Sequence, residues 1–312
     1  MAEPPTAFIQ VDLDGLWAVR RCYGLRGSPE QDDPVYSCAL PTLLDLFERF
    51  SIKATFFVVG ADAEVAWKRE RLKAVIERGH EIANHSMDHD LGLANASLDK
   101  LTNELICSQK TLSERLDVEP RGFRAPGYAF SGALAQAMCG TGLWYDASLL
   151  PTLWGWLMRG AGRLIAAGPR QSKAWYGSLR GAGSSLRPYR LATESDGGSG
   201  QRQLWEIPIS VTPGLRLPFH GAIGYLLGTG WVNRAIGKVG RAEGVINYVI
   251  HGIDLIDGRQ WEVVPTRLGR LVFERRVGER VDFLTEILRR LSGECRVCRT
   301  DQWVEQTQSS SS

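Results

Sequence analysis

The sequence predicts an α/β fold with a mostly parallel sheet, and two observations point to it. Short apolar runs typical of strands alternate with longer amphipathic runs typical of helices along most of the 312 residues. Hydrophobic residues make up 44% of the chain and charged residues 23%, the composition of a soluble globular protein with a sizeable core. The length fits one large domain, such as an α/β barrel, or two small ones.

The elements follow one another regularly in the first half of the chain. The run KATFFVVG is rich in β-branched and aromatic residues, which indicates a buried strand. The charged helix after it ends at Gly79, a residue suited to a helix C-terminus. In chain order we predict a strand at 7–13, a helix at 39–50, a strand at 53–60, a helix at 63–78, a strand at 80–84 and a helix at 98–116.

The second half of the chain is less regular. Residues 148–203 break the alternation and are too many for a plain connection, so we expect a functional insertion or lid there. The barrel domain is expected to span 1–295. Residues 296–312 are expected to form a polar tail, disordered over its serine-rich end at 306–312. Further strands are predicted at 122–125, 143–147, 204–211 and 246–251, with a closing helix at 281–291.

Composition and termini exclude several classes of protein. The formal net charge is only +2, and no nucleic-acid partner is expected. The opening residues MAEPPTAF lack the basic and apolar regions of a secretory signal, and no apolar run is long enough to predict a membrane span. The six cysteines are scattered, so free thiols in a reducing cytoplasm are expected rather than disulfides. Cys295 and Cys298 have CxxC spacing, but no second pair accompanies them to complete a zinc ribbon.

Two aspartates close the first predicted strand. Because side chains alternate along a strand, Asp12 and Asp14 point to one side while Val11 and Leu13 point to the other. Neighbouring carboxylates repel each other, which raises one pKa unless a cation lies between them. The pair is either a solvated strand end with turn-forming aspartates, or one metal ligand beside one general base.

Two of the five histidines follow another predicted strand. In NHSMDH, His85 and His89 stand four positions apart, a spacing that alone predicts metal binding only weakly. Catalytic residues of parallel barrels collect at the carboxyl ends of the strands, so Asp14 could join this pair on one cation. Two imidazoles and one carboxylate, with open positions for water, are a standard catalytic zinc arrangement. Asp88, between the histidines, is expected only to stabilise the loop.

Two further strand ends supply polar residues. Arg124, in GFRAPGY, could hold a carboxylate ionised, or could form an ordinary surface ion pair. His251 ends the last predicted strand, where a histidine suits general acid catalysis. A satisfied histidine of the core is the plainer interpretation of the same residue.

In their order along the chain, these motifs resemble the polysaccharide deacetylase superfamily, also called NodB-homology or carbohydrate esterase family 4. The resemblance covers about residues 7–291 and includes ATFFVVG, GHEIANHSMDH, GFRAPGY, WEIP and IHGID after the two aspartates. It implies a distorted (β/α) barrel that uses a divalent metal to hydrolyse an N-acyl group of an amino sugar. The metal implied is Zn²⁺, with Co²⁺, Ni²⁺ or Mn²⁺ as alternatives.

The resemblance also implies roles for single residues. Asp14, His85 and His89 look like the metal ligands. Asp12 looks like the base that takes a proton from the attacking water, and Arg124 looks like the partner that holds Asp12 in place.

Three more residues match positions of the family. Tyr128 matches the residue whose backbone N–H faces the oxyanion. His251 matches the acid that protonates the leaving amine, and Trp205 matches an aromatic residue that packs near the site.

Two motifs differ from the commonest pattern of the family. The commonest first motif has adjacent aspartates, whereas here they are two apart, as in branches that act on peptidoglycan-like or lipid-linked substrates and on other amides. The last motif reads HGID instead of the more usual His-Pro-Trp.

Two segments are basic and contain tryptophan. Residues 147–193 carry seven basic side chains and no acidic one, and 221–240 also lack acids. Basic amphipathic segments with tryptophan suit a membrane surface that carries anionic lipid, so 149–190 and 221–240 are predicted to contact one. The alternative is an amphipathic helix packed on the barrel with its arginines in solvent.

Together these observations predict a metal-dependent carbohydrate N-deacylase. The substrate is expected to be an N-acylated amino sugar or glycolipid, which the protein is expected to reach at the cytoplasmic face of the membrane. Three alternatives stay open: a deacetylase of a soluble or peptidoglycan-like polymer, an amidase of the allantoinase-like branch, and a metal-free sugar- or membrane-binding module.

Overall fold

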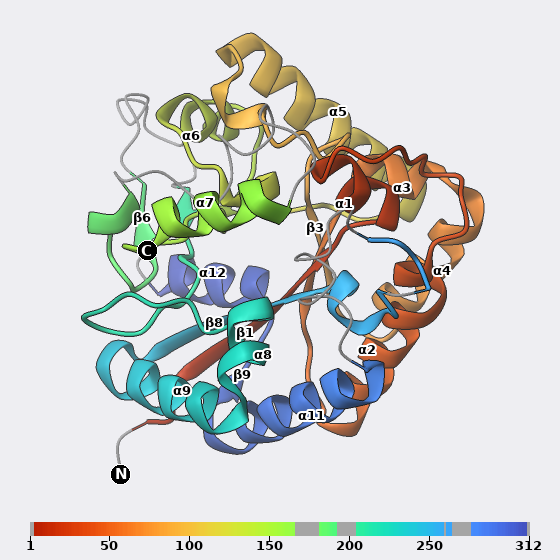
Figure 1. The fold of residues 1–312 in the computed structure, drawn as a ribbon. Helices are drawn as coiled ribbons and strands as arrows, with labels where there is room; N and C mark the ends of the chain where they lie inside the picture. The colour runs from red at the N-terminus through yellow and green to blue at the C-terminus, as the bar shows by residue number, and fades with distance from the viewer. Residues whose placement is uncertain (1–2, 166–180, 192–203, 259, 264–275, 311–312) are drawn as a thin grey trace.

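One curled sheet, wrapped on its outside by helices, makes up the centre of the protein (Figure 1). The structure is a computed structural model that describes residues 3–165, 181–191, 204–258, 260–263 and 276–310. Within these residues the strand path runs β6-β7-β5-β4-β3-β2-β1-β8, and β9 pairs with the beginning of β1. The strands are Thr6–Leu13 (β1), Thr55–Val58 (β2), Glu81–Asn84 (β3), Gly122–Phe123 (β4), Tyr145–Asp146 (β5), Tyr189–Arg190 (β6), Trp205–Glu206 (β7), Val245–His251 (β8) and Arg296–Val297 (β9).

The predicted parallel α/β class is confirmed, because every strand pair is parallel except β6 with β7. Helices connect successive strands, as a parallel sheet requires. The α-helices are Leu16–Cys22 (α1), Leu40–Arg49 (α2), Gly60–Glu64 (α3), Ala66–Glu77 (α4), Leu98–Leu116 (α5), Gly132–Cys139 (α6), Gly155–Ile165 (α7), Gly221–Leu227 (α8), Thr229–Glu243 (α9), Val277–Glu294 (α11) and Thr300–Ser309 (α12). Short π- or 3₁₀-turns lie at Val35–Ala39, Leu93–Asn95, Pro126–Tyr128, Gly181–Gly183 and Gly252–Leu255.

β1 lies in the middle of the sheet, between β2 and β8. Its residues alternate as predicted: Ala7, Ile9, Val11 and Leu13 belong to the main core, together with apolar residues of α2, α9 and α11. The other face of β1 looks into the barrel, where Phe8 joins an apolar cluster with Phe57 and Tyr145. Along that inner face the residues change from Phe8 through Gln10 to Asp12, so the interior of the barrel is apolar at the amino end of β1 and polar at its carboxyl end.

The curled sheet is closed through backbone and side-chain hydrogen bonds of Ser210 and Asn247. The backbone N–H of Ser210 donates to the carbonyl oxygen of Asn247 at 3.2 Å, and the Asn247 N–H donates to Ser210 Oγ at 2.8 Å. Asn247 Nδ2 also donates to the carbonyl oxygen of Ile207 at 3.1 Å. The segment after β7 therefore lies against β8 and completes a distorted barrel.

The C-terminal segment is a correction to the prediction of a disordered polar tail. Residues 296–297 pair with β1, and α12 extends to Ser309, so 306–309 are helical. α12 is held because Val304 is buried among Phe8 and Trp205, and because the hydroxyl of Thr300 contacts Gln10 at 3.0 Å. The polar composition of this segment concealed one apolar contact, at Val304, and one buried hydrogen bond, at Thr300.

The predicted insertion at 148–203 is only partly described, since 166–180 and 192–203 lie outside the described residues. What is described includes α7 and β6, and β6 pairs antiparallel with β7 at the edge of the sheet. The division into 1–295 and a tail, and the role of a lid, stay predictions. Among the described helices, not one combines the length and the apolar character that crossing a membrane would need.

Candidate active site

Six of the eight predicted site residues line one pocket at the carboxyl ends of the strands. They come from the ends of β1, β3 and β8 and from the turn after β4, which the parallel sheet brings to one edge. The six are Asp12, Asp14, His85, His89, Tyr128 and His251. Arg124 lies fully buried directly behind the pocket, and Trp205 lies elsewhere.

Asp14, His85 and His89 form a cluster of metal-ligand type, with their ligand atoms within 4.8 Å of one another. The Nε2 atoms of His85 and His89 lie 3.0 and 3.3 Å from Asp14 Oδ1. His85 Nδ1 lies 2.7 Å from the carbonyl oxygen of Arg124, which fixes Nδ1 as the protonated nitrogen and turns the Nε2 lone pair toward Asp14.

The donor set fits a divalent cation. Asp14 Oδ1 is buried and has no hydrogen-bond partner among the described residues, although two imidazole nitrogens face it. A buried acceptor opposite a nitrogen lone pair is unfavourable unless a cation lies between them. Two histidines and one aspartate are also the ligand types of catalytic zinc sites. The expected divalent-metal site is therefore supported by its geometry.

The pKa values of Asp14 and His89 each depend on the charge of the other residue. Burial acts to raise the pKa of Asp14, but His89 and His85 hold it well below its usual range. Burial acts to lower the pKa of His89, but Asp14 and then Cys22 raise it well above its usual value. The site thus favours positive charge next to the Asp14 carboxylate, as a cation-binding site does.

The loop that carries the two histidines is held by its own polar residues. Ser86 and His89 adopt positive φ values of 65° and 52°, a conformation that costs energy for residues other than glycine. Asn84 Oδ1 accepts the Ser86 N–H at 2.9 Å, and Ser86 Oγ accepts the His89 N–H at 3.1 Å. Asp88 is exposed and contributes no ligand atom to the cluster.

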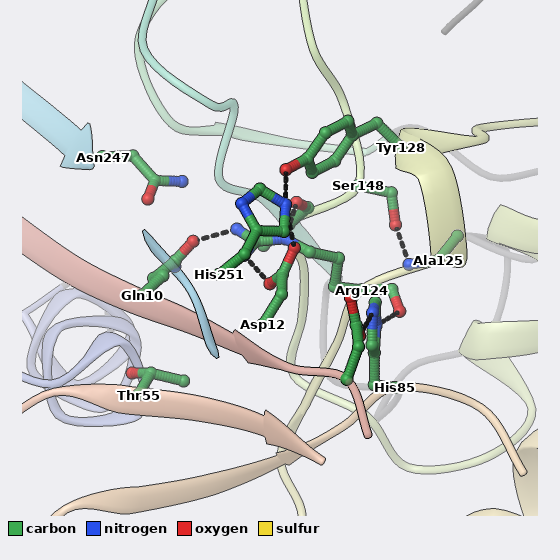
Figure 2. Close-up of polar contacts among 12 residues, drawn as sticks. Gln10, Asp12, Thr55, His85, Arg124, Ala125, Tyr128, Ser148, Asn247 and His251 are labelled. Atoms are coloured by element: carbon green, nitrogen blue, oxygen red, sulfur yellow. Dashed lines mark hydrogen bonds and ion pairs between the residues drawn. The ribbon is translucent and has the colours of Figure 1, made fainter. Parts of the chain in front are cut away.

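Asp12 is an inward-facing carboxylate fixed by Arg124 (Figure 2). Arg124 Nη1 lies 2.5 Å from Asp12 Oδ1, Nη2 donates to Gln10, and Nε donates to the carbonyl oxygen of Ala147 at 2.9 Å. Both charged side chains are at most 3% exposed. The second carboxylate oxygen, Oδ2, is left facing His251 and the pocket.

His251 lies between the phenol of Tyr128 and the carboxylate of Asp12 (Figure 2), and a second carboxylate, Asp254, faces its other ring nitrogen. Its Nε2 is 2.7 Å from the Tyr128 hydroxyl and 3.6 Å from Asp12 Oδ2, and its Nδ1 is 3.7 Å from Asp254 Oδ2. Burial acts to lower its pKa, but the hydrogen bond with Asp254 and the charge of Asp12 raise the pKa to about 9. The imidazole is therefore protonated at neutral pH and can donate a proton.

Two further carboxyl groups lie buried near Arg124. Burial raises the pKa of Asp146 to about 6, and burial together with Asp146 raises the pKa of Glu206 well above its usual value. Glu206 accepts the N–H of Leu149 at 3.2 Å, so this pair supports the loop after β5.

Tyr128 and Trp205 differ from what the sequence predicted. The backbone N–H of Tyr128 donates to the carbonyl oxygen of Ala125 at 3.1 Å, so in this conformation it does not face an oxyanion. Tyr128 reaches the site through its hydroxyl instead. Trp205 packs against Trp303 with ring centroids 5.3 Å apart and is absent from the pocket wall, because α12 covers this end of the barrel.

Three pocket residues were not singled out by the sequence. Asp254 sits three residues after His251 in a motif that was quoted for its histidine alone. His220 is 6% exposed, contacts the Tyr128 ring, and has an Nε2 without a partner among the described residues; burial lowers its pKa to about 3. Cys22 Sγ lies 3.6 Å from His89 Nδ1. The scarcity of histidine was the one signal that could have pointed to His220.

Comparisons with known proteins agree with this fold and with the resemblance that the motifs indicate. Residues 31–145 match the sequence model of the polysaccharide deacetylase family. A peptidoglycan-N-acetylglucosamine deacetylase of Bacillus cereus is 36% identical over 124 residues, which are 40% of this chain and 52% of the relative. The solved structures of PuuE allantoinase and of a probable polysaccharide deacetylase from Pseudomonas aeruginosa have TM-scores of 0.61 and 0.60. Both are 12% identical, over 96% of this chain and 89% of theirs.

These matches bear on the fold and on the family that the chain resembles. At 12% identity the solved structures bear on the fold alone, and they agree with the distorted (β/α) barrel. The family match and the curated homologue confirm the predicted resemblance to the polysaccharide deacetylase superfamily. The chain spans about half the length of the first curated relatives it matches, and less of others.

Proposed function

We propose that this chain is a metal-dependent hydrolase that removes an N-acyl group, in the first instance acetyl, from an amino sugar. The observation that carries the proposal is the convergence of three groups in one pocket: the ligand cluster of Asp14, His85 and His89, the fixed carboxylate of Asp12, and the protonated imidazole of His251. The family match supports the reaction, and the name of the Bacillus cereus relative supports an N-acetylated sugar.

Asp14, His85 and His89 would hold the cation, which we propose is Zn²⁺. When bound, a divalent cation supplies Lewis acidity to the acyl carbonyl and lowers the pKa of a water molecule. His85 is oriented for this role by the Arg124 carbonyl oxygen, and His89 by the sulfur of Cys22.

The chain's own groups account for the proton transfers. Asp12 Oδ2 accepts a proton from the attacking water, while Arg124 holds the carboxylate in place through Oδ1. A C–O bond forms at the acyl carbon and the C–N bond breaks. His251 gives its Nε2 proton to the departing nitrogen, and the Tyr128 hydroxyl at 2.7 Å holds the ring in place. The products are a free amine and a carboxylic acid.

Metal analysis combined with an acyl-release assay tests this proposal. The purified protein should contain about one divalent ion per chain and release acetate from an N-acetylated chitooligosaccharide. His89→Ala should lose both properties. Asp88→Ala should keep both, because Asp88 directly precedes His89 in the same loop but is exposed. Full metal occupancy in His89→Ala would show that the ligand assignment is wrong, and turnover of allantoin in place of the sugar would favour the ring-opening amidase.

We further propose that the natural substrate is lipid-linked and reached at an anionic membrane surface. The support is a set of exposed apolar side chains on or next to helices that line the pocket. α7 and α8 supply the pocket residues Met158 and Ile223. Leu215 lies next to the beginning of α7, because Trp154 Nε1 donates to the Leu215 carbonyl oxygen at 2.8 Å. The set consists of Leu153, Trp156, Leu157, Leu215, Leu226 and Leu227, six of the eight large exposed apolar side chains of the described residues.

Vesicle co-sedimentation tests the membrane proposal. Vesicles containing anionic lipid should retain the protein, and replacing Trp156 and Leu226 together by serine should weaken retention several-fold. Ile106→Ser is the matched control, because Ile106 is an apolar side chain that is 50% exposed but lies on α5 and does not line the pocket. Full activity on soluble oligosaccharide without any vesicle binding would contradict a lipid-linked substrate.

A further inference from the structure

A cluster of three buried charges lies beside the candidate metal site. Lys68 Nζ is 2.7 Å from Asp33 Oδ2 and 2.6 Å from Asp62 Oδ1. All three side chains are at most 2% exposed. Buried ion pairs contribute little net stability compared with apolar residues of similar size, so this cluster calls for another explanation.

The two carboxylates of this cluster face the turn that follows Asp14. Asp62 Oδ2 accepts the Gly15 N–H at 3.2 Å, and Asp62 Oδ1 accepts the indole N–H of Trp17 at 2.8 Å. The Leu16 N–H lies 3.0 Å from Asp33 Oδ2. The turn packs tightly as well, since a Cβ at Gly15 would lie 2.7 Å from the Trp17 ring. The backbone directly after Asp14 is thus fixed by Asp33 and Asp62.

The same short helix that carries Asp62 also holds the histidine loop. At the beginning of α3, the Gly60 N–H donates to the Ser86 carbonyl oxygen at 2.9 Å, and the Ala61 N–H donates to the Met87 carbonyl oxygen at 3.0 Å. A Cβ at Gly60 would lie 2.6 Å from Met87 Sδ. Ser86 and Met87 stand between His85 and His89, so α3 contacts the loop that carries both imidazoles.

We propose that α3, locked by Lys68, is a positioning element that sets the spacing between Asp14 and the two histidine ligands. One end of α3 binds the backbone of the histidine loop, and the Asp62 side chain binds the backbone after Asp14. Lys68 is needed because two buried carboxylates must both remain acceptors for the N–H groups of Gly15, Leu16 and Trp17. The inference rests on the proposed metal site.

The electrostatics of the cluster agree with this role. Burial raises the pKa of Asp62 to about 6, and Lys68 acts in the opposite direction while Asp33 adds to the rise. Without the ammonium group, Asp33 and Asp62 would repel each other in a buried place, and one would take up a proton. The hydroxyl of a protonated carboxyl group is a donor, so one of the two oxygens could no longer accept an N–H group of the turn as a carboxylate oxygen does.

The test compares Lys68→Met with Lys73→Met, a lysine of the same helix α4 whose ion pair with Glu70 is exposed. Metal affinity is measured by competition with a chromophoric Zn²⁺ chelator, and ligand geometry by the visible spectrum of the Co²⁺-loaded protein. Lys68→Met should bind Zn²⁺ about 10- to 100-fold more weakly and show an altered Co²⁺ spectrum. Lys73→Met should match wild type in both measurements.

Asp62→Asn provides a second, nearly isosteric variant that retains the pair of Lys68 with Asp33. It should also weaken Zn²⁺ binding, and it decides the question if Lys68→Met does not fold. Wild-type affinity and spectrum in a folded Lys68 or Asp62 variant, with only a lower melting temperature, would overturn the positioning role. Failure of the wild-type protein to bind any divalent metal would instead overturn the proposed function itself.

Discussion

Arg124 at the end of β4 forms a buried ion pair with Asp12 on β1, although β3 and β2 separate these two strands in the sheet. The guanidinium reaches across the inside of the barrel and also lies 4.2 Å from the centre of the Phe57 ring. Because Arg124 is fully buried, its ion pair with Asp12 fixes the position of that carboxylate inside the barrel.

Asp12→Asn is therefore expected to keep the fold and the bound metal but to lose turnover. An amide can still accept the hydrogen bond from Arg124, yet it cannot take a proton from water. The loss of a general base lowers kcat by about 100- to 10,000-fold. Metal content and acyl release, measured on the same preparation, check this outcome. Loss of metal together with activity would mean that Asp12 serves the ligand cluster instead.

The pH dependence of the reaction should report His251. Its raised pKa of about 9 means that the proton is held at neutral pH and is lost as the pH rises through about 9. The kcat/KM profile is expected to fall on the alkaline side near that value. Asp254→Asn removes one group that raises the pKa, so its alkaline limb should move to lower pH. Asp257→Asn, exposed in the same segment, should leave the limb in place, and a shift of equal size in both variants would contradict the assignment.

His220 is expected to contribute to substrate binding. Its buried imidazole is neutral, because burial lowers its pKa to about 3, and it can therefore share a hydrogen bond with a sugar hydroxyl. His220→Leu should raise KM about 3- to 10-fold, the usual worth of one hydrogen bond, with kcat and metal content near wild type. Steady-state kinetics on the chitooligosaccharide distinguish this from a role in the chemistry, which would lower kcat at unchanged KM.

The local pattern of the sequence predicted the placement of several site residues. Alternation along β1 put Asp12 and Asp14 on the face opposite Val11 and Leu13, and the core contains Val11 and Leu13 as expected. The order of strand ends likewise predicted that His85, His89 and His251 would meet. Alternation and strand order depend on local backbone geometry, which short sequence windows record well.

Residues whose role depends on distant partners were not predictable in this way. Lys68 occurs in the charged run AWKRERLKAVIE and looks like its solvated neighbours, yet its partners Asp33 and Asp62 come from other segments. The strands β4, β5 and β7 are each two residues long, whereas apolar content alone predicted longer ones.

The C-terminal helix should contribute to stability. Val304→Ala removes a side chain that is 0% exposed among Phe8, Phe57 and Trp205, and it should lower the free energy of unfolding by about 1–3 kcal/mol. Gln302→Ala, exposed on the same helix, should change the free energy of unfolding by less than about 0.5 kcal/mol. Urea unfolding followed by circular dichroism measures both, and equal midpoints for the two variants would show that α12 does not anchor to the barrel.

The central place of β1 also bears on how the protein is made. Gln10 pairs with Thr55 on one side and with Val249 on the other, so β1 needs a neighbour that is translated much later than β1 itself. Until β8 has been translated, one edge of β1 has no strand beside it, and the backbone N–H and C=O groups of that edge are unpaired. Contacts of such high sequence separation slow folding, and an exposed edge invites association with other nascent chains. Residues of β8 should therefore affect the yield of soluble protein in the cell more than their equilibrium stability alone would indicate.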